Sequence, residues 1–122
     1  GGSLVTLSFH GASKVMPNYN VMGVAKAALE TSVKYLSVDL GDQDVRVNAI
    51  SAGPMRTLAG AAIANARDVF NYTSENSSLK RNVNLDELGN SALYLVSDLS
   101  SAITGEIHYV DCGFNIVGMP KS

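Results

Sequence analysis

Residues 44–54 of this chain, DVRVNAISAGP, decide its fold. The first seven, Asp44 to Ile50, alternate polar with β-branched or apolar residues and predict a β-strand. The next four, Ser51 to Pro54, contain a Gly-Pro pair that marks a turn. The segments on either side of this strand and turn indicate which kind of sheet the strand joins.

On the N-terminal side, residues 1–9 (GGSLVTLSF) predict a turn that leads into a short strand. Residues 18–40 repeat apolar side chains with a helical period, so a helix is expected from Asn18 to about Leu40. Gly41 is a natural stop for that helix. The strand at 44–50 therefore follows a strand and a helix.

On the C-terminal side, residues 56–70 are small and alanine-rich, which favours a helix that buries little surface, and we interpret it as a mobile flap. The polar segment 72–78 is expected to be a loop. Asn84, with Glu87 three places on, predicts a capped helix that runs to about Val96.

Residues 106–110 predict a last strand, which follows the turn at 104–105 and ends at Asp111-Cys112-Gly113. The order strand, helix, strand, helix, helix, strand predicts an α/β fold with a parallel sheet and crossover helices. Three strands make a thin sheet of this kind, and no Gly-rich phosphate-binding loop is present. We therefore expect further strands and that loop to belong upstream.

The composition restricts the function. The 122 residues are 46% hydrophobic and 16% charged, with a net charge of -2, which fits one folded domain and gives no footprint for nucleic acid. Cys112 is the only cysteine, and His10 and His108 lie far apart, so no disulfide or metal site is expected. No apolar run could span a bilayer, so we expect no membrane association and a cytoplasmic location.

Tyr19 and Lys26, seven residues apart in YNVMGVAK, are the leading catalytic candidates. If the run is helical, seven residues make about two turns, so both side chains would leave one face roughly 10 Å apart. A nearby ammonium would favour the phenolate over its ordinary pKa of about 10. The alternative is a chance pair on a helix surface.

Four parts of the chain resemble the short-chain dehydrogenase/reductases: residues 17–26, 45–54 and 56–59, and Gly105 together with Val110-Asp111. Within them the chain is most similar to the NADH-dependent enoyl-acyl-carrier-protein reductases. Most members of the superfamily place the tyrosine four residues before the lysine, where this chain has Met22. The resemblance implies that residues 1–122 are the C-terminal, catalytic part of one Rossmann-like domain, a doubly wound parallel sheet with flanking helices. The N-terminal cofactor-binding part would be absent.

The resemblance also implies roles for individual residues. Tyr19 would donate a hydrogen bond to the thioester oxygen as enolate charge develops, and Lys26 would hold the nicotinamide ribose. The other cofactor-binding positions would be Gly53, Pro54, Met55 and Thr57. Thr57 could instead be an ordinary helix N-cap.

The implied acyl pocket is lined by Phe9, Tyr19, Met22, Ala59 and Ile63, although core packing explains the apolar ones nearly as well. Many relatives carry a second tyrosine at the position of Phe9, so we expect Phe9 only to shape the pocket. We expect Cys112 to be a buried, unreactive thiol.

The implied activity is NADH-dependent reduction of trans-2-enoyl-acyl-carrier-protein thioesters in fatty-acid elongation by a homotetramer, with NADPH left open. A carbonyl-reducing short-chain dehydrogenase is the first alternative, and it would use Thr6 or Ser8 to bind the carbonyl oxygen. The second alternative is a non-catalytic fragment or assembly element. We expect the chain alone to be inactive and to bind NADH weakly or not at all.

Overall fold

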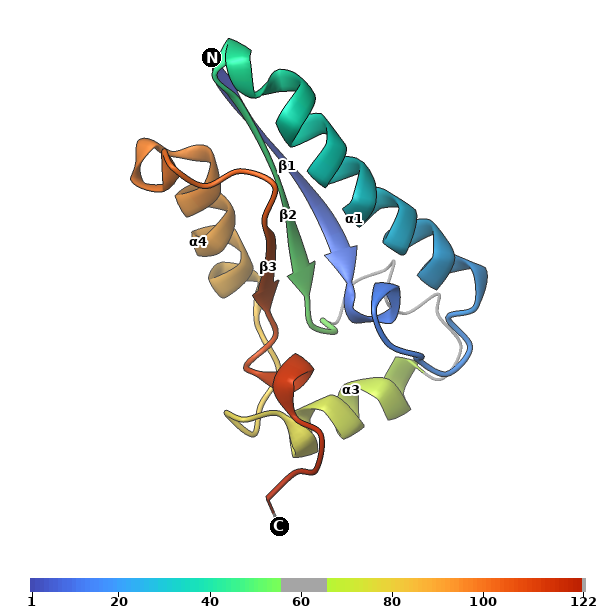
Figure 1. Cartoon of the computed structure of the whole chain (residues 1–122). Coiled ribbons are helices and arrows are strands. Elements are labelled where there is room, and N and C mark those ends of the chain that lie inside the picture. Colours follow the sequence, from blue (N-terminus) through green and yellow to red (C-terminus); the bar gives the residue numbers. More distant parts are fainter. Residues whose placement is uncertain (56–65, 122) are drawn as a thin grey trace.

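A computed structural model describes residues 1–55 and 66–121 of the chain (Figure 1). Its strands are β1 (Gly2–Phe9), β2 (Val45–Ala52) and β3 (Ile107–Val110). Its helices are α1 (Val21–Leu40), α3 (Ala66–Asn76) and α4 (Leu85–Val96). Short 3-10 turns are η1 (His10–Ala12), η2 (Gly41–Gln43), η3 (Asp98–Ser100) and η4 (Phe114–Ile116).

The three strands form a parallel sheet in the order β1-β2-β3, which confirms the predicted α/β architecture. Phe9 pairs with Ala52, and Ala52 pairs with Val110, so the three strands end side by side. Figure 1 shows α1 and α4 on opposite sides of the sheet and α3 beyond the strand arrowheads. The carboxyl ends of the strands therefore meet at one edge.

Central strand β2 builds the core on both faces. Val47 and Ala49 pack with Val33 of α1. Ile50 and Ala52 point the other way and pack with Leu95 of α4. This alternation follows the two-residue period of a strand, and it explains why six consecutive residues of β2 are buried.

Several element boundaries differ from the sequence-based predictions. Helix α1 begins at Val21 rather than Asn18, and β2 continues through Ala52 instead of ending at Ile50. Gly41 does not adopt a left-handed conformation. The chain runs on into η2, and Asp44 takes the positive φ of 57°. Asparagine and aspartate adopt this conformation more readily than most other residues.

The prediction of a loop at 72–78 is wrong for most of its length, because α3 continues to Asn76. Two of the polar side chains bond to the backbone of the helix: Thr73 Oγ1 donates to Val69 O, and Asn76 Nδ2 donates to Tyr72 O. A polar composition was therefore compatible with a helix here. The predicted helix at 56–70 is confirmed only from Ala66, and its earlier part lies outside the described residues.

The predicted start of α4 is confirmed in atomic detail. Asn84 Oδ1 accepts the backbone N–H of Glu87 at 2.9 Å, and Glu87 Oε1 accepts the N–H of Asn84 at 3.1 Å. This reciprocal capping box satisfies two N–H groups that the first turn leaves unpaired. Across residues 1–55 and 66–121, no helix has the length and apolar character needed to cross a membrane.

Candidate active site

The candidate site lies at the carboxyl edge of the parallel sheet, where ligands bind in open α/β sheets. Strand β1 delivers Phe9 to this edge, and β2 delivers the segment Gly53–Met55. Strand β3 delivers Asp111, which follows its last residue. The topology therefore gathers three of the predicted segments from distant parts of the sequence.

Tyr19 reaches this edge from a turn and not from a helix, so the prediction that Tyr19 and Lys26 share a helical face is wrong. The turn precedes α1, and both neighbours of Tyr19 have positive φ, 61° at Asn18 and 49° at Asn20. Asparagine tolerates this region better than most residues. Met22 N–H donates to Tyr19 O and Gly23 N–H donates to Asn20 O, which joins the turn to the helix.

The Tyr19 ring is held by tertiary contacts that the sequence analysis missed. The residue is 5% exposed, and its ring meets Phe9 edge to face with centroids 5.0 Å apart. A methyl group at Gly11 would lie 2.3 Å from Tyr19 Cδ2. A methyl group at Gly23 would lie 2.8 Å from Gly11 O. The Tyr19 ring thus lies in a slot formed by Phe9, Gly11 and Gly23. A side chain at either glycine would clash with the atoms around this slot.

Glycine has a low helix propensity, so Gly23 in the first turn of α1 is unfavourable for the helix itself. Its presence there was a sequence signal that the backbone makes a close contact at this position. Gly11 gave no comparable signal, because its neighbour Tyr19 is eight residues away and is brought close by the turn.

The Tyr19 hydroxyl remains available to a ligand. Within the described part of the chain it makes no hydrogen bond, and it is not among the fully buried atoms that lack a partner. Burial raises the pKa of Tyr19, which corrects the expectation that Lys26 lowers it. The phenol therefore stays protonated at neutral pH and can donate a hydrogen bond.

Lys26 lies on the second turn of α1 and is half-buried. Its ammonium donates to Leu7 O of β1 at 2.9 Å. An ammonium carries three N–H donors, so two remain for a ligand. This arrangement suits a pair of neighbouring hydroxyls, which is what the ribose of a nicotinamide cofactor presents.

The segment after β2 matches its predicted place in part. Gly53 N–H donates to Val110 O at 3.0 Å, so this amide extends the sheet and is not free for a cofactor. A methyl group at Gly53 would lie 3.2 Å from Asp111 Cα, which explains the glycine by close packing. Pro54 and Met55 are half-buried, and Met55 packs against the Ile50 cluster. Thr57 lies outside the described residues.

The predicted acyl-pocket residues are only partly placed by the structure. Phe9 contacts Tyr19 directly, as above. Met22 is 47% exposed on the first turn of α1, so it is not a core residue of the described chain. Ala59 and Ile63 lie outside the described residues.

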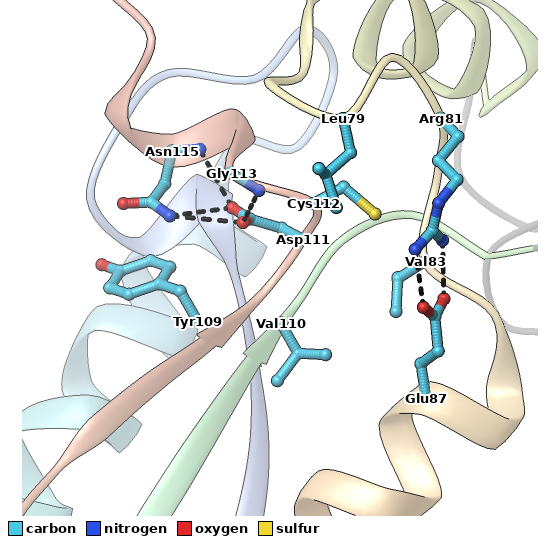
Figure 2. Close-up of a pocket in the computed structure, with 10 residues that line it drawn as sticks. All are labelled: Leu79, Arg81, Val83, Glu87, Tyr109, Val110, Asp111, Cys112, Gly113 and Asn115. Carbon is cyan, nitrogen blue, oxygen red and sulfur yellow. Dashed lines mark hydrogen bonds and ion pairs between the residues drawn. The ribbon is translucent and has the colours of Figure 1, made fainter.

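A separate hollow of about 240 Å³ lies at the exit of β3 (Figure 2). Arg81 and Glu87 face each other across a bidentate ion pair, with N–O distances of 2.8 and 2.7 Å. This contact lowers the pKa of Glu87 to about 2. Asp111 turns its carboxylate onto the N–H groups of Gly113 and Asn115. The charged side chains of this hollow therefore already have partners within the protein.

Cys112 lines the same hollow and is half-buried, rather than buried as expected. Burial raises the pKa of its thiol, so the unreactive protonated form predominates at neutral pH, in line with the expected inertness. No group of histidine, cysteine or acidic side chains among residues 1–55 and 66–121 is arranged to hold a metal ion.

The parallel sheet with helices on both faces places the chain in the class of Rossmann-like α/β proteins, which bind ligands at the carboxyl edge of the sheet. Comparison with known proteins narrows the class to one family. The chain belongs to the enoyl-(acyl carrier protein) reductase family, whose sequence pattern matches residues 1–115.

The relatives it resembles are longer proteins. An NADH-type enoyl-[acyl-carrier-protein] reductase of Rhizobium meliloti is 61% identical over 120 residues, which cover 98% of this chain and 45% of the relative. The corresponding Rickettsia typhi protein is 56% identical over 121 residues. The chain thus spans less than half the length of the relatives it matches.

Solved structures agree with this assignment. The FabI crystal structure from Candidatus Liberibacter asiaticus matches with a TM-score of 0.95 and 60% identity, over 99% of this chain and 47% of that one. An Anaplasma phagocytophilum enoyl-acyl-carrier-protein reductase, solved in complex with NAD, matches with a TM-score of 0.94 and 58% identity.

Proposed function

We propose that this chain supplies the tyrosine and lysine of an NADH-dependent reductase that acts on trans-2-enoyl thioesters of acyl carrier protein in fatty-acid synthesis. The observation that carries the proposal is the placement of a neutral, ligand-accessible Tyr19 phenol at the sheet edge that also presents Lys26 and the Gly53–Met55 segment. Relatives of the family that are 61% and 56% identical carry this activity in their names.

In this proposal the Tyr19 hydroxyl donates a hydrogen bond to the thioester oxygen, where negative charge develops during reduction. A preorganised donor in a site shielded from water stabilises such charge far better than a donor in bulk water. Burial of the ring on Phe9 and Gly11 fixes the donor before substrate arrives. The cofactor would supply the hydride.

Lys26 would hold the ribose hydroxyls of NADH with its two uncommitted N–H donors. Met55, Pro54 and Thr57 would contact the nicotinamide and phosphate region, while Gly53 contributes through packing and its carbonyl. Phe9, Met22, Ala59 and Ile63 would line the acyl pocket. Each of these roles can be tested by substitution.

We further propose that residues 1–122 act as the C-terminal, catalytic part of one larger Rossmann-like domain. Two exposed leucines of β1 support this: Leu4 is 53% exposed and Leu7 is 51% exposed. Among the described strands, β1 pairs only with β2, so its other edge can accept a further strand. The remaining cofactor contacts would come from that added part.

A homotetramer is also proposed, in a cytoplasmic location. Helix α1 exposes four large apolar side chains, at fractions of 69% to 80%: Val21, Val24, Tyr35 and Val38. Large exposed apolar patches mark interaction sites, and these side chains on α1 support such a site. Sedimentation of the complete polypeptide would test the number of subunits.

The experiment that tests the activity uses the complete polypeptide that carries this chain, with NADH and a crotonyl thioester. Reduced-nicotinamide absorbance should fall, and Lys26→Met should weaken NADH binding. No loss of absorbance with any enoyl thioester would contradict the proposal. Turnover of a β-ketoacyl thioester alone would favour a carbonyl reductase. This chain by itself should bind NADH weakly or not at all.

A further inference from the structure

Two side chains of α1 form hydrogen bonds with two adjacent residues of β1, close to the end of the strand that reaches the candidate site. Lys26 and Glu30 are four residues apart, so they lie on one face of the helix. The Lys26 ammonium donates to Leu7 O at 2.9 Å, and Ser8 Oγ donates to Glu30 Oε2 at 2.5 Å. The lysine and the carboxylate thus contact neighbouring residues of the strand instead of each other.

A lysine and a glutamate at this spacing are neighbours on a helix surface and can form an ion pair, although the lysine-first order is the less favourable one. In residues 1–55 and 66–121, no carboxylate lies within ion-pairing distance of the Lys26 ammonium. The Glu30 carboxylate is occupied by the hydroxyl of Ser8, a residue that is 5% exposed. A hydroxyl-to-carboxylate bond is charge-assisted, which makes it stronger than a hydrogen bond between neutral groups.

The hydrogen bond to Glu30 also restricts the role of the Ser8 hydroxyl. A serine hydroxyl has one proton, and Ser8 donates it to Glu30. It is therefore not free to donate to the carbonyl oxygen of a substrate. The hydroxyl has a partner on α1, and any effect of Ser8 on the site passes through that partner.

We propose that Ser8 is a positioning residue that holds the Glu30 carboxylate away from Lys26, so that the ammonium keeps two N–H donors for a vicinal diol such as a cofactor ribose. This inference rests on the proposed function, which gives Lys26 that ligand. Without Ser8, Glu30 would turn to its helical neighbour Lys26. The resulting ion pair would have to break before a diol could bind.

The test is a double-mutant cycle in the complete polypeptide, with Ser8→Ala, Glu30→Gln and the combination of the two. Dissociation constants for NADH come from fluorescence titration, and kcat and KM from NADH oxidation with a crotonyl thioester. Ser8→Ala should weaken NADH binding about tenfold, the scale of one hydrogen bond to a charged group. Adding Glu30→Gln should restore most of the affinity, because the neutral amide cannot pair with Lys26.

Ser32→Ala is the matched control. Ser32 also lies on α1, and the one bond that its hydroxyl makes to the described residues is to Ala28 O on the exposed side of the helix. Its removal should leave the NADH dissociation constant unchanged. If Ser8 merely stabilised the fold, the double variant would be at least as impaired as Ser8→Ala, and that result would overturn the proposal.

A crystal structure of the Ser8→Ala variant provides a readout that does not depend on activity. It should show Glu30 within ion-pairing distance of Lys26, and a carboxylate that stays away from Lys26 would also overturn the proposal. A wild-type protein that binds NADH but reduces no enoyl thioester would contradict the proposed function alone. The binding cycle would then still decide the role of Ser8.

Discussion

Phe9 and Tyr19 meet edge to face, with ring centroids 5.0 Å apart and ring planes at 61°. Phe9 is the last residue of β1 and is held in register opposite Ala52 of β2. Tyr19 lies in a turn, without a regular helix or strand of its own to position it. The contact therefore ties the candidate catalytic phenol to the rigid end of the sheet.

Replacing Phe9 with alanine should loosen Tyr19 and lower kcat for enoyl reduction by about tenfold, since an aromatic pair of this kind contributes about 1 kcal/mol beyond its buried area. Phe9→Leu keeps most of the bulk of the side chain, so its kcat should lie between those of Phe9→Ala and the wild type. Steady-state kinetics on the complete polypeptide measures both. An alanine variant with unchanged kcat would contradict this role of the ring contact.

Phe9→Tyr should change turnover by less than tenfold, because the ring that packs on Tyr19 is retained and the added hydroxyl has no assigned task. The measurement is kcat with a crotonyl thioester. An increase of more than tenfold would show that a hydroxyl at this position takes part in the reaction, and the interpretation of Phe9 as a shape-determining residue would be wrong.

Gly11→Ala should displace the Tyr19 ring, because the new methyl group would lie 2.3 Å from Cδ2 and 2.7 Å from Cε2. We expect a loss of kcat of at least about a hundredfold, the scale of a misplacement of roughly 1 Å. NADH affinity should change far less, since Lys26 is bonded to β1 and not to the turn.

Gly41→Ala is the control for Gly11→Ala, because a methyl group at Gly41 meets nothing within 4 Å. It should retain wild-type kcat and NADH affinity. Equal loss of kcat in both variants would mean that the effect comes from general destabilisation and not from the tyrosine slot.

The Tyr19 phenol should ionise only above the ordinary tyrosine pKa of about 10, because burial raises its pKa. The folded protein then binds this proton more tightly than the unfolded chain. The stabilisation is complete below about pH 10 and is lost as pH rises through the folded pKa. The chain has five tyrosines. The measurement is therefore an alkaline absorbance titration of the wild type and of Tyr19→Phe, and the difference between the two curves reports Tyr19. A group that titrates below pH 10 would contradict this prediction.

Asn84→Ala should destabilise the protein by about 1 kcal/mol, because it removes the side-chain acceptor of the capping box at the start of α4. Chemical denaturation of the complete polypeptide measures the change in the free energy of unfolding. Asn90→Ala, at an exposed position within α4, should be neutral or slightly stabilising, since alanine has the higher helix propensity. Equal destabilisation by both substitutions would contradict the capping interpretation.

The elements that sequence patterns predicted well are those whose residues interact with near neighbours. The capping box of Asn84 and Glu87 spans three residues, and the apolar period of α1 repeats every turn. The segment at 72–76 was misassigned because two of its polar side chains, those of Thr73 and Asn76, bond to the helix backbone. The same residues in a loop would have an identical composition.

The sequence singled out candidate residues for the site but did not predict how the structure positions them. Tyr19 and Lys26 were identified from their spacing, yet the helix that was assumed to carry both begins only after Tyr19. Gly11 was missed because its contact with Tyr19 depends on the conformation of the turn between them. Ser8 was considered only as a carbonyl-binding residue, since nothing in a strand pattern indicates a bond to Glu30 on a helix.

The sequence by itself determined the parallel α/β architecture and the family, and it singled out Tyr19 and Lys26 as the candidate pair. These depend on local periodicity and on motifs of adjacent residues. Tertiary structure alone decided the slot of Gly11 and Phe9 that holds Tyr19, the raised pKa of its phenol, and the Ser8–Glu30 bond beside Lys26. The physical reason is that burial and contact between distant residues arise only after the chain has packed.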